Sequence, residues 1–242
     1  MKTLGIVLCA GALAGCAGQL FAPSGFSGAP AEVRCQSEPN QEQDLALSLA
    51  QEMASEGRLH AALAHLQRLP HDSPEVRLRK ARVLRSLGRE EARAQYQSLL
   101  STCLAAAGEH GLGQLAAARG DQVEARERLE RAAHMEPTDA RVRNDLGVIY
   151  LRQGRTEDAR FEFLTALELD QKSQVAALNL LTLLFYADQW QPAAELISRQ
   201  GFSADQVRKA EARARNLKSV SVAALPEAGE PLPTPDTDEQ GI

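Results

Sequence analysis

The sequence predicts an all-α protein in which short helix pairs stack on one another. Apolar residues recur at three- and four-residue spacing through most of the chain, which is the period of a helix with one buried face. A turn residue followed by a small residue recurs every 31 to 34 positions. Ala and Leu dominate, and aromatic residues make up only 4% of the chain, which suits thin, closely packed helices. A pair of such short helices cannot bury both of its faces alone, so we expect neighbouring pairs to cover it.

The repeat is clearest at 140–170, which predicts two helices joined by a turn at 153–155. Large and small residues alternate there, so that Tyr150 and Phe163 can fill the space left by Gly147. The same order of a turn residue and a following alanine recurs along the chain: Gly57 with Ala62, Gly88 with Ala92, Gly120 with Ala125, Gly154 with Ala159 and, in a weaker copy, Asp188 with Ala193.

This pattern resembles the tetratricopeptide repeat, a helix pair of about 34 residues. Arg143 departs from the family pattern, which usually has Trp there, and Gln171 stands where Pro is usual. The resemblance implies a right-handed superhelical solenoid of about four to five helix pairs plus a capping helix. An ordinary all-α bundle with accidental spacing is the alternative. For a repeat that starts at Ala140, the matching large and small positions are Leu146, Gly147, Tyr150, Ala159, Phe163 and Ala166.

The array is expected over residues 42–218, with pairs at 43–74, 75–105, 106–139, 140–173 and 174–202 and a cap at 203–217. In the second pair the helices should cover 74–87 and 90–104. Pro192 fits the first turn of the last pair's second helix, because a first-turn N–H has no helical partner. The cap helix, expected at 204–217, is mostly Lys, Arg, Glu and Ala, and its polar face would close the end of the array against water.

The first fifteen residues predict a targeting segment. Lys2 supplies a positive start, and 4–13 is an apolar run that is too short to span a bilayer. The run ends in Leu13-Ala14-Gly15-Cys16, which resembles the lipobox of bacterial lipoproteins. That resemblance implies a signal peptide at 1–15, a covalent lipid on Cys16 and, because Ala17 rather than Asp follows, attachment at the periplasmic face of the outer membrane. A plain secretory signal is the alternative.

Two segments that flank the array predict no fold of their own. Residues 16–41 are rich in Gly, Pro, Ser and Ala and lack a helical period, which is typical of a flexible tether. Residues 219–242 contain four prolines and five acidic residues without Lys or Arg, which predicts a disordered acidic tail. That tail is either a solvated end or a binding segment.

Charge and motif content argue against several classes of function. The formal net charge is −5, whereas nucleic-acid binding needs a basic surface that displaces counterions. The five histidines are scattered, and none pairs with Cys at zinc spacing. We therefore expect no catalytic residues, no metal site, no small-molecule substrate and no cofactor apart from the lipid on Cys16. The chain is predicted to bind proteins and not to be an enzyme.

The cysteines predict an oxidising compartment. Cys9 would leave with the signal peptide and Cys16 would carry lipid, so Cys35 and Cys103 remain. An even number of cysteines in such a compartment makes these two a candidate disulfide. The alternative is that Cys103 is simply a small buried hydrophobic residue.

The family resemblance also implies a binding groove, lined by the first helix of each pair. Arginine, asparagine and exposed aromatic side chains suit peptide recognition. The family's clamp of Lys and Asn for a chain terminus is not reproduced, so an internal segment or a folded partner is equally expected. For Phe185 and Tyr186, packing under the last helix is the alternative. The groove residues carried over from the family are Arg141, Asn144, Arg152, Asn179, Thr182, Phe185 and Tyr186.

The phrases NDLGVIYLRQGRTEDA and ALNLLTLLFYADQWQPAAELI are similar to the TadD family of tight-adherence (Tad/Flp) pilus lipoproteins. This resemblance implies an adaptor that holds a segment of the secretin or another pilus component at the outer membrane. Lipoproteins that help the type IV pilus secretin assemble have a similar architecture and are an alternative. A second alternative is an adaptor for periplasmic cell-wall enzymes.

Overall fold

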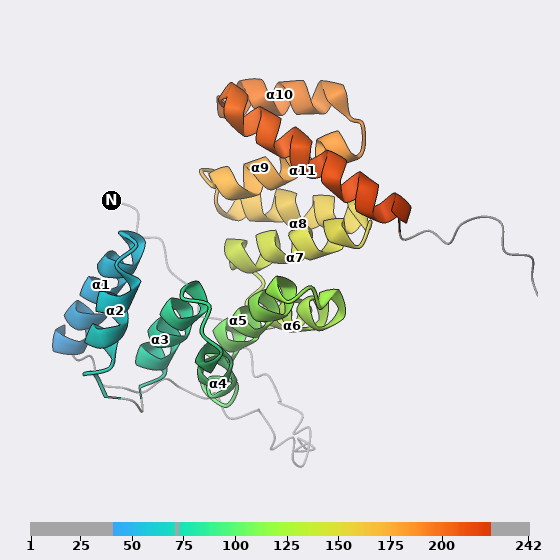
Figure 1. Cartoon of the computed structure of the whole chain (residues 1–242). Helices are drawn as coiled ribbons and strands as arrows, with labels where there is room; N and C mark the ends of the chain where they lie inside the picture. The colour runs from blue at the N-terminus through green and yellow to red at the C-terminus, as the bar shows by residue number, and fades with distance from the viewer. Residues whose placement is uncertain (1–40, 71–72, 224–242) are drawn as a thin grey trace, which may run out of the picture. The chain divides into compact units, whose positions relative to one another are not determined.

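The computed structural model describes residues 41–70 and 73–223, with side chains as far as residue 220. These residues form eleven α-helices and no strand, so the predicted all-α class is confirmed (Figure 1). The helices are α1 (Gln41–Ser55), α2 (Leu59–Leu66), α3 (Pro74–Ser86), α4 (Glu91–Gln97), α5 (Ala105–Ala118), α6 (Gln122–Met135), α7 (Ala140–Arg152), α8 (Thr156–Leu169), α9 (Gln174–Tyr186), α10 (Trp190–Gln200) and α11 (Ala204–Ala223).

Several predictions fall on residues that the structure does not describe. The signal peptide at 1–15, the lipidated Cys16, Cys35 and all but the last residue of the tether at 16–41 lie outside the described residues. So does 224–242 of the predicted tail. These parts of the sequence stay predictions.

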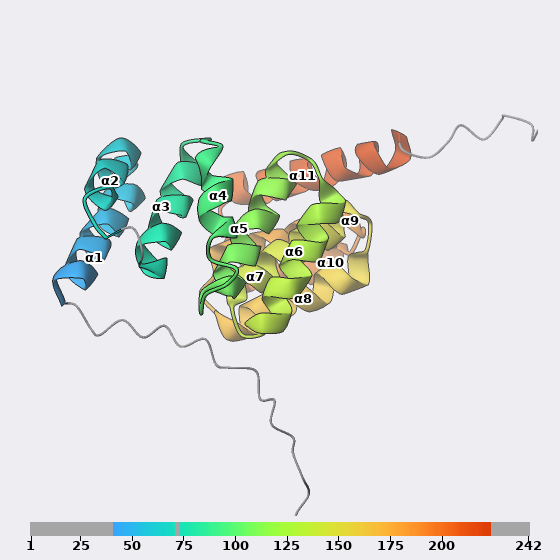
Figure 2. The ribbon, with the colours of Figure 1, turned by 90° about the horizontal axis from the view of Figure 1, so that it is seen from below.

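The helices pack in consecutive antiparallel pairs, and the pairs stack. α1 packs on α2, α3 on α4, α5 on α6, α7 on α8 and α9 on α10. The second helix of each pair also contacts the first helix of the next, and successive first helices touch each other. Figure 2 shows this succession from a second direction. The first helices α1, α3, α5, α7 and α9 therefore follow one another along the array.

Each pair turns at the position that the spacing predicted. Gly57, Gly88, Gly120, Gly154 and Asp188 all have positive φ. In each turn the next residue donates its backbone N–H to the carbonyl five positions earlier, as in Arg155 to Tyr150 at 2.9 Å. This bond closes the end of a helix whose last carbonyls would otherwise lack donors. Asp188 is the one described non-glycine residue with positive φ, at 55°.

Small residues let the two helices of a pair approach closely. Ala62, Ala92, Ala125 and Ala159 are fully buried, and Ala193 is 1% exposed. Against Phe163, a Cβ added to Gly147 would lie 2.7 Å from the ring, so an alanine there would overlap it. The core follows the array in three clusters, of which the largest runs from α5 to α11.

Two helix boundaries differ from the prediction by more than two residues. α4 ends at Gln97, whereas a helix was expected at 90–104. The following Ser98 and Thr102 donate their hydroxyls to the carbonyls of Gln95 and Leu99, both at 2.7 Å, and such local bonds compete with helical ones. The last helix was expected to end at 217 but continues to Ala223.

α11 covers one neighbour in particular. It runs obliquely across α9 in Figure 1 and packs mainly against that helix. Ala210 and Ala214 are buried in this contact, and Lys218 forms an ion pair with Asp188 at 2.7 Å. The polar side chains of α11 thus face outward, while a narrow strip of small residues lies on the apolar surface of α9.

Candidate functional site

The first helices α1, α3, α5 and α7 line an open groove of about 540 Å³. Its wall is polar and cationic, because several arginines of α3 lie on this side of the helix. The charged and polar residues that line it are Gln51 on α1, Arg79, Arg82 and Arg85 on α3, His110 and Gln114 on α5, Arg141, Asn144 and Asp145 on α7, and Asp170 and Ser173 between α8 and α9.

Asp145 is the centre of a hydrogen-bond network that joins three helices. His110 Nε2 lies 2.7 Å from Asp145 Oδ2, and Gln114 donates to the same oxygen at 2.7 Å. Asn144 donates to Asp145 Oδ1 at 3.1 Å and accepts from Asn179 on α9 at 2.8 Å. The network fixes these side chains relative to one another, so the groove presents a defined polar surface.

The electrostatics of this network favour the ionised carboxylate. Burial alone would raise the pKa of Asp145, but the hydrogen bond from His110, its charge, and the donors of Gln114 and Asn144 hold that pKa below its usual value. The pKa of Asp139 is lowered in a similar way, since hydrogen bonds from Arg141 outweigh burial. The acids nearest the groove therefore already have partners.

The arginines of α3 have a different environment. Arg79 donates to Gln51 at 2.7 Å. The pKa of Arg82 is lowered by burial first, and then by the like charges of Arg141 and Arg79. The Nε atom of Arg85 is buried and has no hydrogen-bond acceptor among the described residues. This part of the groove concentrates positive charge.

A comparison with known proteins decides the family. A family model described as "Tetratricopeptide repeat" matches residues 116–184. The chain is 44% identical over 234 residues to TPR repeat-containing protein PA4299 of Pseudomonas aeruginosa, covering 96% of this chain and 93% of that protein. The chain belongs to the tetratricopeptide-repeat proteins. Members of such repeat families use extended concave surfaces for binding, so this chain is a protein-binding scaffold.

Solved structures share the fold at low sequence identity. Pseudomonas aeruginosa PilF aligns with a TM-score of 0.57 at 20% identity, over 76% of this chain and 94% of PilF. TTC0263, a thermophilic TPR protein of Thermus thermophilus, aligns with a TM-score of 0.59 at 21% identity, over 73% of this chain and 99% of the other. These likenesses support the fold alone.

Within this tetratricopeptide-repeat array, the predicted groove residues divide between two places. Arg141 and Asn144 line the groove described above. Arg152, Asn179 and Thr182 line a second hollow of about 520 Å³, bounded by α7, α9 and α11. A shallower hollow lined by Arg85 of α3, by Asp145 and Arg152 of α7, and by side chains of α5 and α6 lies between these two. Five of the residues that the family resemblance implies therefore line hollows along the first helices.

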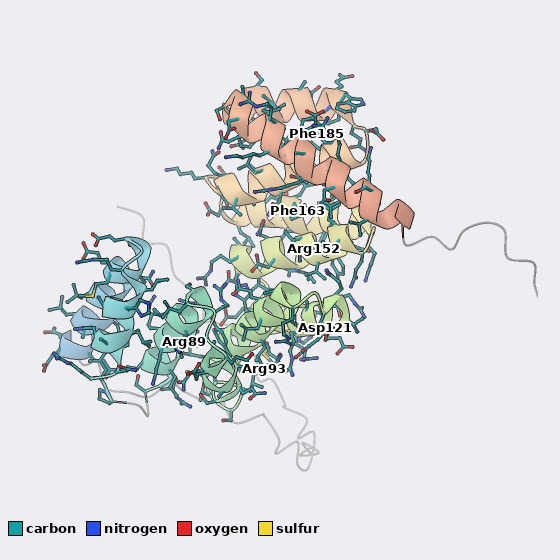
Figure 3. All side chains as sticks on the ribbon, viewed as in Figure 1. Arg89, Arg93, Asp121, Arg152, Phe163 and Phe185 are labelled. Atoms are coloured by element: carbon teal, nitrogen blue, oxygen red, sulfur yellow. The ribbon has the colours of Figure 1, made fainter. Side chains whose placement is uncertain are left out.

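The expectation of an exposed aromatic surface at Phe185 is wrong. Phe185 is 7% exposed and its ring lies 5.7 Å from that of Trp190, in the core where α9 meets α10 (Figure 3). Thr182 is 4% exposed and donates its hydroxyl to Leu178 within the same helix. Tyr186 is half-buried against the same core. The physical reason is that α7, α8, α10 and α11 all contact α9, which is apolar around most of its circumference.

Asn144 is also buried, at 8% exposed, so it positions Asp145 more than it offers itself to a ligand. The exposed members of the predicted set are Arg141 and Arg152. Whether any of these residues binds a partner stays a prediction.

Sequence reasoning missed Arg79, Arg82 and Arg85, as well as His110 and Gln114. The groove residues that the family resemblance implies all lie on the fourth and fifth pairs, so they include no residue of α3 or α5. The signal that could have revealed the arginines is their three-residue spacing, which keeps them near one face of α3.

The predicted disulfide and the expectation of no metal site also concern residues that the structure describes in part. Cys103 is disulfide-bonded. Cys35 lies outside the described residues, so the pairing of these two cysteines stays a prediction. No cluster of three or more His, Cys, Asp or Glu side chains that could hold a metal ion occurs in the part of the chain that the structure describes. Within the same residues, no helix combines the length and the apolar character needed to cross a membrane.

Proposed function

We propose that the protein is an outer-membrane-anchored adaptor that supports assembly of a pilus-type secretion machine by holding a segment of the secretin or another pilus component. The observation that carries this proposal is the open groove on the first helices, since the Asp145 network fixes its polar side chains on α5 and α7 before any ligand arrives. Preorganised polar groups lower the entropy lost on binding.

The predicted lipid on Cys16 gives the groove a location. Several acyl chains, at ~0.8 kcal/mol per buried CH₂, hold a protein stably at a membrane. The 16–41 segment would then act as the tether between the lipid and the array. An adaptor of this kind makes and breaks no bond; it raises the local concentration of its guest near the membrane.

Two pilus machines are candidates. The sequence phrases at 144–159 and 177–197 favour the tight-adherence pilus, because they resemble the TadD family. The structural likeness to PilF favours the alternative, a lipoprotein that assists the type IV pilus secretin. At 20% identity that likeness supports the fold and leaves the choice of machine to experiment.

The test is deletion of the gene in the bacterium that makes the protein, with complementation by the wild-type chain. We expect heat-resistant secretin multimers in outer-membrane fractions to fall and surface pili to be lost, with both restored by complementation. Assays of surface adherence and of twitching motility in the same strain separate the two machines. Normal secretin multimers and normal pili in the deletion strain would overturn the proposal.

Purification from detergent extracts under native conditions addresses the remaining alternative. We expect a secretin or another pilus component to copurify with the tagged chain. If periplasmic cell-wall hydrolases copurify instead, the protein is an adaptor for those enzymes and the pilus proposal is wrong.

A further inference from the structure

We propose that the arginines of α3 are a docking site for an extended acidic segment of the protein partner, with at least two carboxylates on one side of the bound chain. This inference rests on the proposed function, because it assumes that the groove binds a protein, and it adds the chemistry that the guest must carry. The site consists of Arg79, Arg82 and Arg85, with Arg141 on the facing helix.

The first argument is the charge balance of the groove. The structure records no ion pair for Arg82 or Arg85 with any of the described residues. Four arginines line the groove against two acids, Asp145 and Asp170. Arg141 forms an ion pair with Asp139 at 2.7 Å, so the excess of positive charge lies on α3. In a chain of net charge −5, this local excess of cations does not follow from composition.

The second argument is that the folded chain partly buries these arginines without giving them an anionic partner. Arg82 is half-buried, and its pKa is lowered by burial and by the neighbouring charges of Arg141 and Arg79. Arg85 has a buried Nε atom without an acceptor among the described residues. A carboxylate that accepts two parallel N–H bonds from a guanidinium would relieve both effects. An anionic guest is therefore stabilised more here than at an exposed arginine.

The third argument is spacing. Arg85 lies six positions after Arg79, which is about 9 Å along the helix axis at 1.5 Å per residue. An extended chain advances about 3.3 Å per residue and points alternate side chains to the same face, so two same-face carboxylates lie about 7 Å apart. Acidic residues two positions apart in the bound peptide can thus form ion pairs with two of the three α3 arginines. Gln51 and Gln114 line the same groove and can bond to the peptide backbone.

The shape of the site favours a peptide over other anions. The arginines line a concave surface between α1, α3, α5 and α7, which a strand of polypeptide can enter and a planar lipid surface cannot follow. A net negative chain also repels nucleic acid outside the groove.

The experiment measures fluorescence anisotropy with the full-length lipoprotein in detergent. The probe is a fluorescein-labelled ten-residue peptide of alternating aspartate and serine, and its control has asparagine in place of aspartate. We expect the aspartate peptide to bind and the asparagine peptide not to bind. Arg82→Gln/Arg85→Gln should weaken binding by about tenfold or more, because charge-assisted hydrogen bonds are lost.

The matched control variant is Arg58→Gln/Arg199→Gln. It removes the same charge from two exposed arginines, one in the turn after α1 and one on α10, away from the groove. We expect its affinity to be that of the wild type. An equal loss in both double variants would mean that the effect is general electrostatics and would overturn the proposal. Should the groove variant fail to fold by circular dichroism, equal binding of the two peptides to the wild-type chain would still overturn it.

Two further arms decide between occupants. Binding to vesicles of anionic phosphatidylglycerol that is lost in Arg82→Gln/Arg85→Gln, without binding of the aspartate peptide, would assign the site to lipid and overturn the proposal. A chain shortened after residue 223 should bind the aspartate peptide as the full chain does. A tenfold gain in affinity on shortening would mean that the acidic 224–242 segment occupies the groove, which also overturns the proposal of an external guest.

The outcomes in cells keep this inference separate from the proposed function. A deletion strain with normal secretin and pili overturns the proposed function. A deletion strain with a defect that Arg82→Gln/Arg85→Gln repairs as well as the wild type overturns only the acidic-guest inference.

Discussion

At the scale of single residues, Asp145 shows how one side chain can hold three neighbours. Its two oxygens accept from Gln114 of the preceding pair and from Asn144 beside it, and His110 lies within hydrogen-bonding distance. A carboxylate with several donors is stabilised in its ionised form, which is why its pKa lies below the usual value despite burial. Asp145 therefore contributes to the stability of the fold and also fixes the positions of side chains that line the groove.

We predict that Asp145→Asn destabilises the fold at neutral pH and that the difference disappears in acid. Because the folded-state pKa of Asp145 is below its unfolded value of about 3.9, its contribution is complete above about pH 4 and is lost as pH falls through the folded value. At pH 7 we expect a loss of about 1.5–3 kcal/mol, the usual range for hydrogen bonds to charged groups. Urea unfolding of both chains between pH 7 and pH 3 measures it.

The groups that face Asp145 are His110 on α5, Arg85 on α3, and Arg141 and Arg152 on its own helix. Because His110 bonds Asp145 directly, the difference between the two pH profiles reports on Asp145 together with its coupling to His110. Glu168→Gln, which changes an exposed carboxylate on α8, should give a pH profile parallel to that of the wild type. A difference between Asp145→Asn and wild type that stays constant down to pH 3 would contradict the assignment.

Single-residue environments were the part that the sequence predicted least well. His110 and Asp145 are 35 positions apart and meet only because adjacent pairs stack, so neither local spacing nor composition indicates their contact. For Phe185 the sequence left exposure and burial both open for a related reason, and the structure shows burial. Its helix has neighbours on nearly every side, and the sequence does not reveal how closely α11 would pack on it.

At the scale of elements, the turns were predictable because their chemistry is local. A left-handed residue after a helix favours glycine, and four of the five turns have it. Asp188 occupies the fifth, and its carboxylate forms the ion pair with Lys218 of α11. The end of α4 was not predictable in the same way, because the apolar pattern continues past Gln97 while Ser98 and Thr102 end the helix.

Two neighbouring repeats replace the family's usual tryptophan with an ion pair of opposite polarity. In the third pair Glu109 of α5 bonds Arg128 of α6 at 3.1 Å. In the fourth pair Arg143 of α7 bonds Glu162 of α8 at 3.1 Å. Both partners are separated by 19 positions, so these are equivalent places with the charges exchanged. An ion pair can thus connect the two helices of a repeat in either orientation.

We predict that the charges of the fourth pair can be exchanged. Arg143→Glu alone places two carboxylates together where Arg143 is 17% and Glu162 7% exposed in the native chain, and should cost about 3 kcal/mol or more. Burial already raises the pKa of Glu162, and Arg143 is what opposes that rise. The exchange Arg143→Glu/Glu162→Arg should recover most of the loss, because it reproduces the ion pair of Glu109 and Arg128. It does not reproduce the second bond that Glu109 accepts from Arg131 at 3.0 Å, since Thr165 stands at the equivalent place.

A double-mutant cycle by urea unfolding measures the recovery. It should be incomplete by about 1 kcal/mol, since Arg143 also donates to the carbonyl of Pro137 at 2.9 Å and glutamate cannot. If the exchanged chain is as unstable as Arg143→Glu alone, the two repeats are not equivalent at this position.

At the scale of the whole molecule, an acidic chain carries a cationic groove. The sequence predicted the repeated pairs because each level agreed: period, turn residue and small residue all recur in phase. It did not predict where positive charge would gather, because Arg141 of the fourth pair meets the α3 arginines of the second pair only in the folded array. The net charge governs how the whole molecule behaves in solution. The local electrostatic field of a concave surface governs which ligand binds there.

The last prediction concerns the attachment of the molecule to its membrane. If Cys16 carries lipid, Cys16→Ser should move the protein from the membrane fraction to the soluble periplasmic fraction, because acyl chains supply ~0.8 kcal/mol per buried CH₂ and serine cannot accept them by the thiol chemistry of the lipobox. The helical circular dichroism spectrum and the affinity for the aspartate peptide should not change, since both belong to residues 41–223. The measurement is immunoblotting of fractionated cells, with radiolabelled palmitate incorporation as a second readout.

Cys9→Ser is the matched control, because that cysteine lies in the apolar run expected to be removed with the signal peptide. It should leave fractionation as in the wild type. A Cys16→Ser chain that remains in the membrane fraction would show that something other than this lipid holds the protein there, and the adaptor would need a different anchor.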